Sequence, residues 1–241
     1  MCGRVVTSSA SDAIAEFFDA SLTIPAEYEP DYNRAPTEPV RAVVDRGRGE
    51  GRELRRFRWG LVPSSAKAIG DGPLMINARA ETVTSKGIFA RLLPYRRCVV
   101  PVDGFYEWQR TGNPKQKQPY LAFPPGGGLF VMAGLWDSWR DGDQVVPSLT
   151  IVTTAANGTM APLHDRMPAI LPPEAWARWL DPELKDPAEL AALLVPSADD
   201  VLALRPVSTL VNSVRNKGPE VLDPPDDPVG SAEVQGSLDL R

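Results

Sequence analysis

The strongest constraint in this sequence is a succession of short β-strand patterns separated by turns rich in Gly, Pro, Asn and Asp. Apolar and alternating runs predict strands at residues 40–45, 54–59, 97–102, 105–110, 120–123, 129–136 and 146–154. Helical patterns are fewer and predict short helices at residues 13–18, 87–93, 173–180 and 187–194. Many short strands in succession are typical of antiparallel pairing. The sequence therefore predicts an α+β fold, with a curved, barrel-like, mostly antiparallel sheet and short peripheral helices.

The composition is that of a folded protein outside the membrane. The chain has 241 residues, of which 43% are hydrophobic and 24% are charged, so neither low hydrophobicity nor extreme charge predicts disorder of the whole chain. No apolar run approaches the roughly 18 to 20 residues that a membrane-spanning helix needs. The first residues lack the pattern of an export signal. We therefore expect a cytoplasmic protein with no membrane partner.

The negative charge is concentrated in the C-terminal tail. The net charge is −5, but residues 219–241 contain six acidic residues and one basic residue, which leaves residues 1–218 balanced. A basic groove on the folded part is therefore allowed despite the acidic total. The tail is also rich in proline, so we expect one domain at residues 1–218 and a disordered tail at residues 219–241.

Soft metal ligands are scarce in this chain. The two cysteines are Cys2 and Cys98, and His164 is the single histidine. Two cysteines are too few for a disulfide framework, and a reducing compartment argues against a single bridge between them. The three residues have no paired spacing, whereas structural zinc usually takes four ligands. We expect no metal and no cofactor.

The second position offers unusual chemistry. An initiator methionine is normally removed before a small residue, and here its loss would leave Cys2 with a free amine beside its thiol. Both groups have reference pKa values near 8, so each is partly in its reactive form at physiological pH. An aldehyde can form an imine with this amine and then be captured by the sulfur as a thiazolidine. Two alternatives remain: Cys2 attacks amides as a nucleophile, or it is a small buried apolar residue near a strand.

Three further polar residues stand in positions that favour chemistry. Asn77 follows an abrupt end to an apolar run, and Glu107 lies between two aromatic residues, where burial would raise the pKa of a carboxyl group. Glu107 could equally be an outward-facing strand residue. His164 lies in a polar loop bounded by prolines, where it is either a catalytic group or a structural residue with satisfied hydrogen bonds.

Taken together, six segments of the sequence resemble the successive motifs of the SOS response-associated peptidase (SRAP) family. They are residues 1–4, 32–36, 59–63, 77–82, 97–108 and 163–168. The resemblance covers roughly residues 2–218 and implies the fold and the activity of this family, whose members sense abasic sites and crosslink to DNA. It implies that Cys2 traps the aldehyde of an abasic site in single-stranded DNA as a thiazolidine, which shields the lesion during the DNA damage response.

The resemblance also implies roles for individual residues. Asn77 would orient Cys2, Glu107 would act as general acid and base, and His164 would pass a proton to the sugar ring oxygen. The residues expected to contact DNA are Arg4, Asn33, Arg79, Trp108 and Arg166. One departure concerns Ser64 and Ser65, which stand where some relatives carry aromatic residues that wedge against bases. A preference for strand junctions is therefore not implied.

The tail contains a second short motif. Gln235, Leu238 and Leu240 resemble the peptides by which bacterial replication proteins dock on the sliding clamp, with the Gln in a polar site and the leucines in an apolar pocket. Plain disorder without a partner is the alternative. Clamp binding would place the protein at the replication fork, where single-stranded abasic sites are met.

We interpret the chain as a monomeric, nucleoid-associated sensor of abasic sites with crosslinking and lyase-like activity. Two alternative functions follow from the same residues. One is a thiol peptidase, or an autoprotease that removes only Met1, with Cys2 as nucleophile and His164 and Glu107 as its partners. The other is a module that binds single-stranded DNA without a covalent bond, in which Cys2 is structural.

Overall fold

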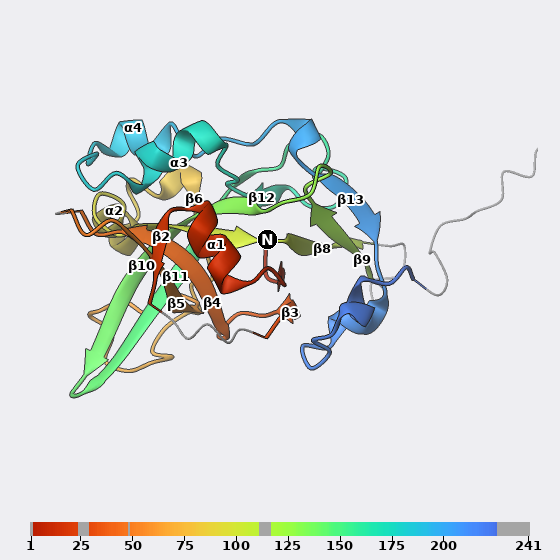
Figure 1. Ribbon diagram of the computed structural model, residues 1–241, viewed down its shortest axis with the longest axis horizontal. Coiled ribbons are helices and arrows are strands. Elements are labelled where there is room, and N and C mark those ends of the chain that lie inside the picture. The colour runs from red at the N-terminus through yellow and green to blue at the C-terminus, as the bar shows by residue number, and fades with distance from the viewer. Residues whose placement is uncertain (1, 24–28, 48, 111–116, 226–241) are drawn as a thin grey trace, which may run out of the picture.

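The computed structural model describes residues 2–23, 29–47, 49–110 and 117–225 (Figure 1). Its larger sheet has eight strands and closes into a barrel. The strands of this sheet are β12 (Arg166–Pro168), β11 (Gln144–Ala155), β10 (Phe130–Asp141), β7 (Arg97–Val102), β4 (Pro39–Asp45), β5 (Arg52–Trp59) and β2 (Ala20–Leu22), with β6 (Asn77–Arg79) paired to β11. Closure results from parallel pairing of β5 with β11, where Leu149 lies opposite Trp59.

The second sheet is smaller and fully antiparallel. Its five strands are, in order, β13 (Ala203–Pro206), β9 (Lys117–Phe123), β8 (Gly104–Arg110), β1 (Val5–Thr7) and β3 (Asp31–Arg34). Only Asp103 separates β7 of the barrel from β8, so the chain passes directly from one sheet into the other. Figure 1 shows the long barrel strands on the left and β8, β9 and β13 on the right.

Short helices lie outside the sheets. They are α1 (Ser11–Phe17), α2 (Gly87–Leu92), α3 (Pro173–Leu180) and α4 (Pro187–Ala191), with 3-10 helices η1 (Ala80–Thr82), η2 (Asp199–Val201), η3 (Thr209–Asn212) and η4 (Pro219–Leu222). Pro173 occupies the first helical position of α3, where the missing N–H costs nothing. Within the described ranges, no helix combines the length and the apolar character that crossing a bilayer requires.

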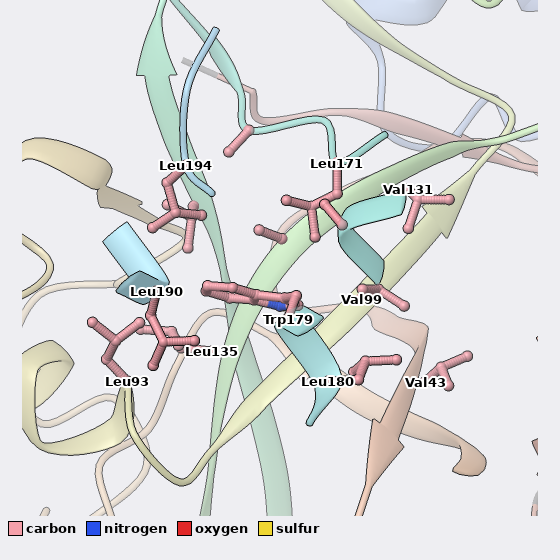
Figure 2. Packing of buried hydrophobic residues seen from close by; sticks show 14 of the residues in the cluster. Val43, Leu93, Val99, Val131, Leu135, Leu171, Trp179, Leu180, Leu190 and Leu194 are labelled. Carbon is pink, nitrogen blue, oxygen red and sulfur yellow. The ribbon is translucent and has the colours of Figure 1, made fainter. Parts of the chain in front are cut away.

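A tryptophan on α3 is the centre of the core between the helices and the barrel. Trp179 is fully buried, and its indole N–H donates to the carbonyl of Cys98 at 2.9 Å. Figure 2 shows the indole surrounded by aliphatic side chains from α3, α4, the barrel and the ends of the helices, among them Leu93, Leu135, Leu190 and Leu194. A second core cluster fills the barrel and includes both cysteines.

A buried arginine ties the same helices to β7. Arg97 donates from Nε to the carbonyl of Trp179 at 2.6 Å and from Nη1 to the carbonyl of Leu93 at 2.8 Å. Burial lowers the pKa of Arg97 to about 10, because the charged form loses solvation. The side chain thus satisfies backbone carbonyls at the ends of α2 and α3, which would otherwise lack donors.

The structure confirms the predicted α+β fold and corrects its C-terminal boundary. We expected the disordered tail to start at residue 219, but η4 packs against the fold and Val221 is fully buried. The backbone N–H of Ser208 donates to the carbonyl of Asp223 at 2.7 Å, so the ordered chain continues past residue 218. The residues of the predicted clamp motif, Gln235, Leu238 and Leu240, lie outside the described residues.

Candidate active site

The start of the chain runs between the two sheets. β1 pairs with β8, and the N–H of Tyr106 donates to the carbonyl of Arg4 at 3.0 Å, which extends the pairing toward Cys2. Cys2 is fully buried and belongs to the core cluster of the barrel. Its burial agrees with a structural role, so any chemistry at Cys2 depends on the polar groups around it.

Asn77 binds the backbone of Cys2 from the barrel side. It is the first residue of β6, which lies parallel to β11 with Asn77 opposite Ile151. Its Nδ2 donates to the carbonyl of Cys2 at 2.9 Å, so the two residues that were predicted to act together are in contact. Its Oδ1 is buried and has no hydrogen-bond partner among the described residues. An acceptor is therefore available on the amide that holds Cys2.

Glu107 approaches Cys2 from the second sheet. It lies on β8, where its side chain is buried, so the outward-facing interpretation of this residue is wrong. Burial of Cys2 and the negative charge of Glu107 both raise the pKa of the thiol, and the positive charge of the chain terminus and a hydrogen bond from the backbone of Arg4 only partly oppose them. The thiol is therefore protonated at neutral pH, with a carboxyl group near enough to influence that proton.

His164 lines a hollow of about 510 Å³ where β6 and β12 flank β11 on its two edges. The residues that line it are Arg79, Glu81, Thr82, His164, Asp165 and Arg166. β11 brings them together, because Thr153 lies opposite both Arg79 of β6 and Pro168 of β12. Asn77 and Arg79 share β6, so the hollow and the contact to Cys2 are two residues apart along one strand.

The surroundings of His164 indicate its tautomer. The backbone N–H of Arg166 donates to Nδ1 at 2.9 Å, and the carboxylate of Asp165 lies at the same distance from Nδ1. A backbone N–H can only donate, so Nδ1 acts as acceptor and the neutral ring carries its proton on Nε2. The side chain of Asp165 is 87% exposed and turns easily into solvent. The hydrogen bond from Arg166 therefore sets the tautomer. In this tautomer His164 can donate a proton from Nε2.

The two arginines of the hollow differ in their contacts. Arg166 donates from Nη1 and Nη2 to the two carboxylate oxygens of Glu81, at 2.6 and 2.9 Å, and from Nη2 to the carbonyl of Thr153 at 2.6 Å. These hydrogen bonds lower the pKa of Glu81. Of the two, Arg79 is the one whose guanidinium is exposed and makes no hydrogen bond or ion pair within the described chain.

Three predicted DNA contacts lie together beside η3 instead. Arg4 donates from Nη1 to Oδ1 of Asn33 at 2.7 Å and to the carbonyl of Val211 at 2.8 Å, and it lies 5.7 Å from the ring centre of Trp108. Trp108 in turn donates from Nε1 to Oδ1 of Asn212 at 2.7 Å. Arg4 and Trp108 are thus engaged in contacts within the fold.

Asn33 requires a correction. It is fully buried, and its Nδ2 lies within hydrogen-bond distance of the carbonyls of Val211, Ser213 and Asn216. A side chain in this position binds η3 and the residues that follow it to β3, and it has no exposed surface for a contact with DNA. The prediction of a direct DNA contact was therefore wrong, because a motif does not indicate which of its members face solvent.

Sequence reasoning also missed residues of the hollow. Glu81 and Thr82 belong to the 77–82 motif, so the sequence placed them near Asn77 and Arg79. The motif alone indicated no chemical role for either residue. The contacts of Asn33 with residues 211–216 had no signal in the sequence, because they join positions that are far apart along the chain. Within the described chain, no three His, Cys, Asp or Glu side chains gather as they would around a metal ion.

Comparison with known proteins agrees with the motifs. Residues 1–214 match the model of the family described as SOS response associated peptidase (SRAP). Abasic site processing protein YoaM of Bacillus subtilis (strain 168) is 43% identical over 227 residues, which cover 92% of this chain and 98% of the relative. Abasic site processing protein HMCES of Gallus gallus is 36% identical, over 82% of this chain and 67% of its own length.

The same likeness holds in three dimensions. A crystal structure of a protein from Bacteroides thetaiotaomicron is similar to this one with a TM-score of 0.81 and 25% identity, over 92% of this chain and 99% of that chain. A phage-related protein from Bordetella bronchiseptica gives a TM-score of 0.68 with 30% identity, over 86% and 95% of the two chains. These structures share the fold, and the match of the family model over residues 1–214 shows that this chain belongs to the SOS response associated peptidase (SRAP) family.

Proposed function

We propose that this protein processes abasic sites in single-stranded DNA by trapping them covalently through Cys2, after Met1 has been removed. Relatives that are named for abasic site processing align with nearly the whole chain. The observation that carries the proposal is the hydrogen bond from Asn77 to the carbonyl of Cys2. It is supported by the buried side chain of Glu107, whose charge adds to burial in raising the pKa of the Cys2 thiol. These are the groups that an aminothiol needs for orientation and for proton transfer.

The proposed reaction needs no oxidant and no cofactor. The amine of Cys2 adds to the C1′ aldehyde carbon of the open-chain sugar, and loss of water gives an imine. The thiol then adds to the imine carbon, with its proton passing to Glu107 and from there to the nitrogen. One C–N bond and one C–S bond form, and one water is released. Glu107 thus acts as base toward sulfur and as acid toward nitrogen.

His164 would act before this condensation. Most of an abasic sugar is a closed hemiacetal, and opening it requires a proton on the ring oxygen. The tautomer that follows from the Arg166 contact carries a proton on Nε2, which suits this donation. Arg79 would bind a neighbouring phosphate from the rim of the hollow, because its guanidinium is exposed and makes no hydrogen bond or ion pair within the described chain.

Access to Cys2 is a requirement of the proposal. Cys2 is fully buried in a chain that still carries Met1, and its nitrogen is then part of a peptide bond. The proposal therefore requires that removal of Met1 frees the amine and uncovers the sulfur. Reactivity toward aldehydes is confined to the processed protein, which limits side reactions of an exposed aminothiol.

The thiol peptidase alternative is less well supported. A nucleophilic cysteine of that kind needs a pKa below its usual range, so that thiolate is present at neutral pH. Burial and Glu107 shift the pKa of the Cys2 thiol in the opposite direction. An aminothiol is less affected by this shift, because its amine attacks first and its thiol adds later within the same molecule.

The proposal is tested by the dependence of the reaction on the aldehyde. Processed protein is incubated with a single-stranded oligonucleotide that contains one abasic site, and the mixture is heated in denaturant and separated on a gel. We expect a heat-stable band of reduced mobility. The same oligonucleotide after borohydride reduction has an alcohol in place of the aldehyde and should give none. A band of equal strength with the reduced oligonucleotide would exclude the thiazolidine.

A further inference from the structure

The charges of the hollow beside Cys2 cancel. Arg79 and Arg166 carry two positive charges, and Glu81 and Asp165 carry two negative ones. Affinity for a nucleic acid backbone comes mainly from cations that replace condensed counterions. A hollow that only had to bind phosphates would gain nothing from these acids, so their presence needs another explanation.

Glu81 accepts hydrogen bonds from the two terminal nitrogens of the Arg166 guanidinium, which would otherwise be available to a phosphate. Its two carboxylate oxygens meet Nη1 and Nη2 in the paired geometry that a guanidinium also forms with a phosphate group. The side chain of Glu81 is 50% exposed, whereas that of Arg166 is 14% exposed. The carboxylate can therefore move into solvent without unfolding its surroundings, while the arginine stays in place.

Arg166 has a second support that does not depend on Glu81. Its Nη2 donates to the carbonyl of Thr153 on β11 at 2.6 Å. Its backbone is fixed by the pairing of β12 with β11, where Arg166 lies opposite Ala155. Loss of the carboxylate should therefore leave the guanidinium in the hollow and available to an anion.

We propose that Glu81 is a specificity-determining residue, whose carboxylate occupies the guanidinium of Arg166 and lowers the affinity of the hollow for undamaged single-stranded DNA. The inference rests on the proposed function, in which this hollow binds the backbone beside the lesion. Undamaged strand is in large excess over abasic sites, and a protein that bound it tightly would be sequestered. A lesion held by Cys2 keeps its phosphate beside Arg166 long enough to displace Glu81.

The test is binding of undamaged DNA by Glu81→Gln in a Cys2→Ala background, which removes the covalent reaction. Fluorescence anisotropy with a labelled oligothymidylate gives the affinity at several salt concentrations. We expect Glu81→Gln to bind about three- to fivefold more tightly, because one more arginine can contact phosphate. The slope of log affinity against log salt should become steeper by about 0.7, the value for one further contact on a single strand.

The matched control is Glu183→Gln in the same background. Glu183 is 84% exposed and, among the described residues, forms an ion pair only with Lys185, at 3.5 Å. It does not line the hollow, so its change removes an equal charge at a distance. Glu183→Gln should change the affinity and the salt slope much less than Glu81→Gln does. An equal gain in both variants would mean that total charge alone matters, and would overturn the inference.

Two further outcomes decide the inference. Unchanged or weaker binding by Glu81→Gln, with an unaltered melting temperature, would mean that Glu81 only positions Arg166, and the inference would be wrong. In protein with Cys2 intact, Glu81→Gln should be inhibited by lower concentrations of undamaged competitor during crosslinking. If the unaltered protein formed no crosslink, the proposed function would be refuted. The affinity of Glu81→Gln for undamaged DNA would still decide the role of Glu81.

Discussion

Replacing Cys2 with alanine is expected to abolish the heat-stable crosslink to abasic DNA. The variant keeps a small second residue, so Met1 is still removed and a free amine remains. That amine can form an imine, but no sulfur is present to close the ring, and the imine hydrolyses or promotes strand cleavage by elimination. The measurement is the gel assay with an abasic oligonucleotide, read both for the shifted band and for cleaved DNA.

The control for this prediction is the other cysteine. Cys98 is also fully buried and its pKa is also raised by burial, but it is the second residue of β7, inside the chain, and has no free amine. Cys98→Ala should therefore retain the crosslink, once its folding has been checked by circular dichroism. If the band persisted in Cys2→Ala and disappeared in Cys98→Ala, the reacting residue would be Cys98, and the prediction would be contradicted.

Replacing Trp179 with alanine is expected to lower the free energy of unfolding by about 3 to 5 kcal/mol, the range for a large buried aromatic residue. The indole is fully buried among the leucines of Figure 2, so its loss leaves a cavity between α3, α4 and the barrel. The carbonyl of Cys98 also loses its donor. Urea titration followed by circular dichroism measures the change.

Two companion variants separate the causes. Trp179→Phe keeps an aromatic ring and loses the N–H, so it should cost about 1 to 3 kcal/mol, the penalty for an unsatisfied buried carbonyl. Tyr95→Ala changes an aromatic residue that is 69% exposed, and surface substitutions of this kind usually stay within about 0.5 kcal/mol. A loss in Tyr95→Ala as large as in Trp179→Ala would contradict the assignment of Trp179 to the core.

Elements with a local pattern were predictable from the sequence. The apolar run of residues 97–102 became β7, and the segment opened by Pro173 became α3 with the expected bounds. Both have a signal within a few residues: a continuous run in a fully buried strand, and a proline at the first helical position. These elements are also the ones that build the barrel and its cover, so the fold class could be predicted.

The closure of the barrel could not be predicted. It depends on the parallel pairing of β5 with β11, and β6 also joins β11 in parallel. β6 has three residues, too few for a periodic pattern, and its partner lies more than seventy positions away in the sequence. Tertiary contacts, and not local preference, make such a segment a strand. The same pairing brings Asn77 to Cys2.

The residues of the candidate site could be predicted from the family resemblance, but their burial could not. The motifs indicated Cys2, Asn77, Glu107 and His164, but they could not indicate that Asn33 is buried. Nor could they indicate that Glu81 occupies the guanidinium of Arg166, since the two residues lie in separate motifs. Exposure and ion pairing arise only when the sheets are assembled.

The central claim is that the amine and the thiol of Cys2 together trap the aldehyde of an abasic site, and mass spectrometry of the crosslinked N-terminal peptide tests it most directly. After digestion of protein and DNA, the proposal predicts a peptide that begins at Cys2, lacks Met1 and carries the sugar remnant with loss of one water. Fragmentation should locate the remnant on Cys2 alone. A crosslinked peptide that retains Met1, or a remnant attached to any other residue, would contradict the account.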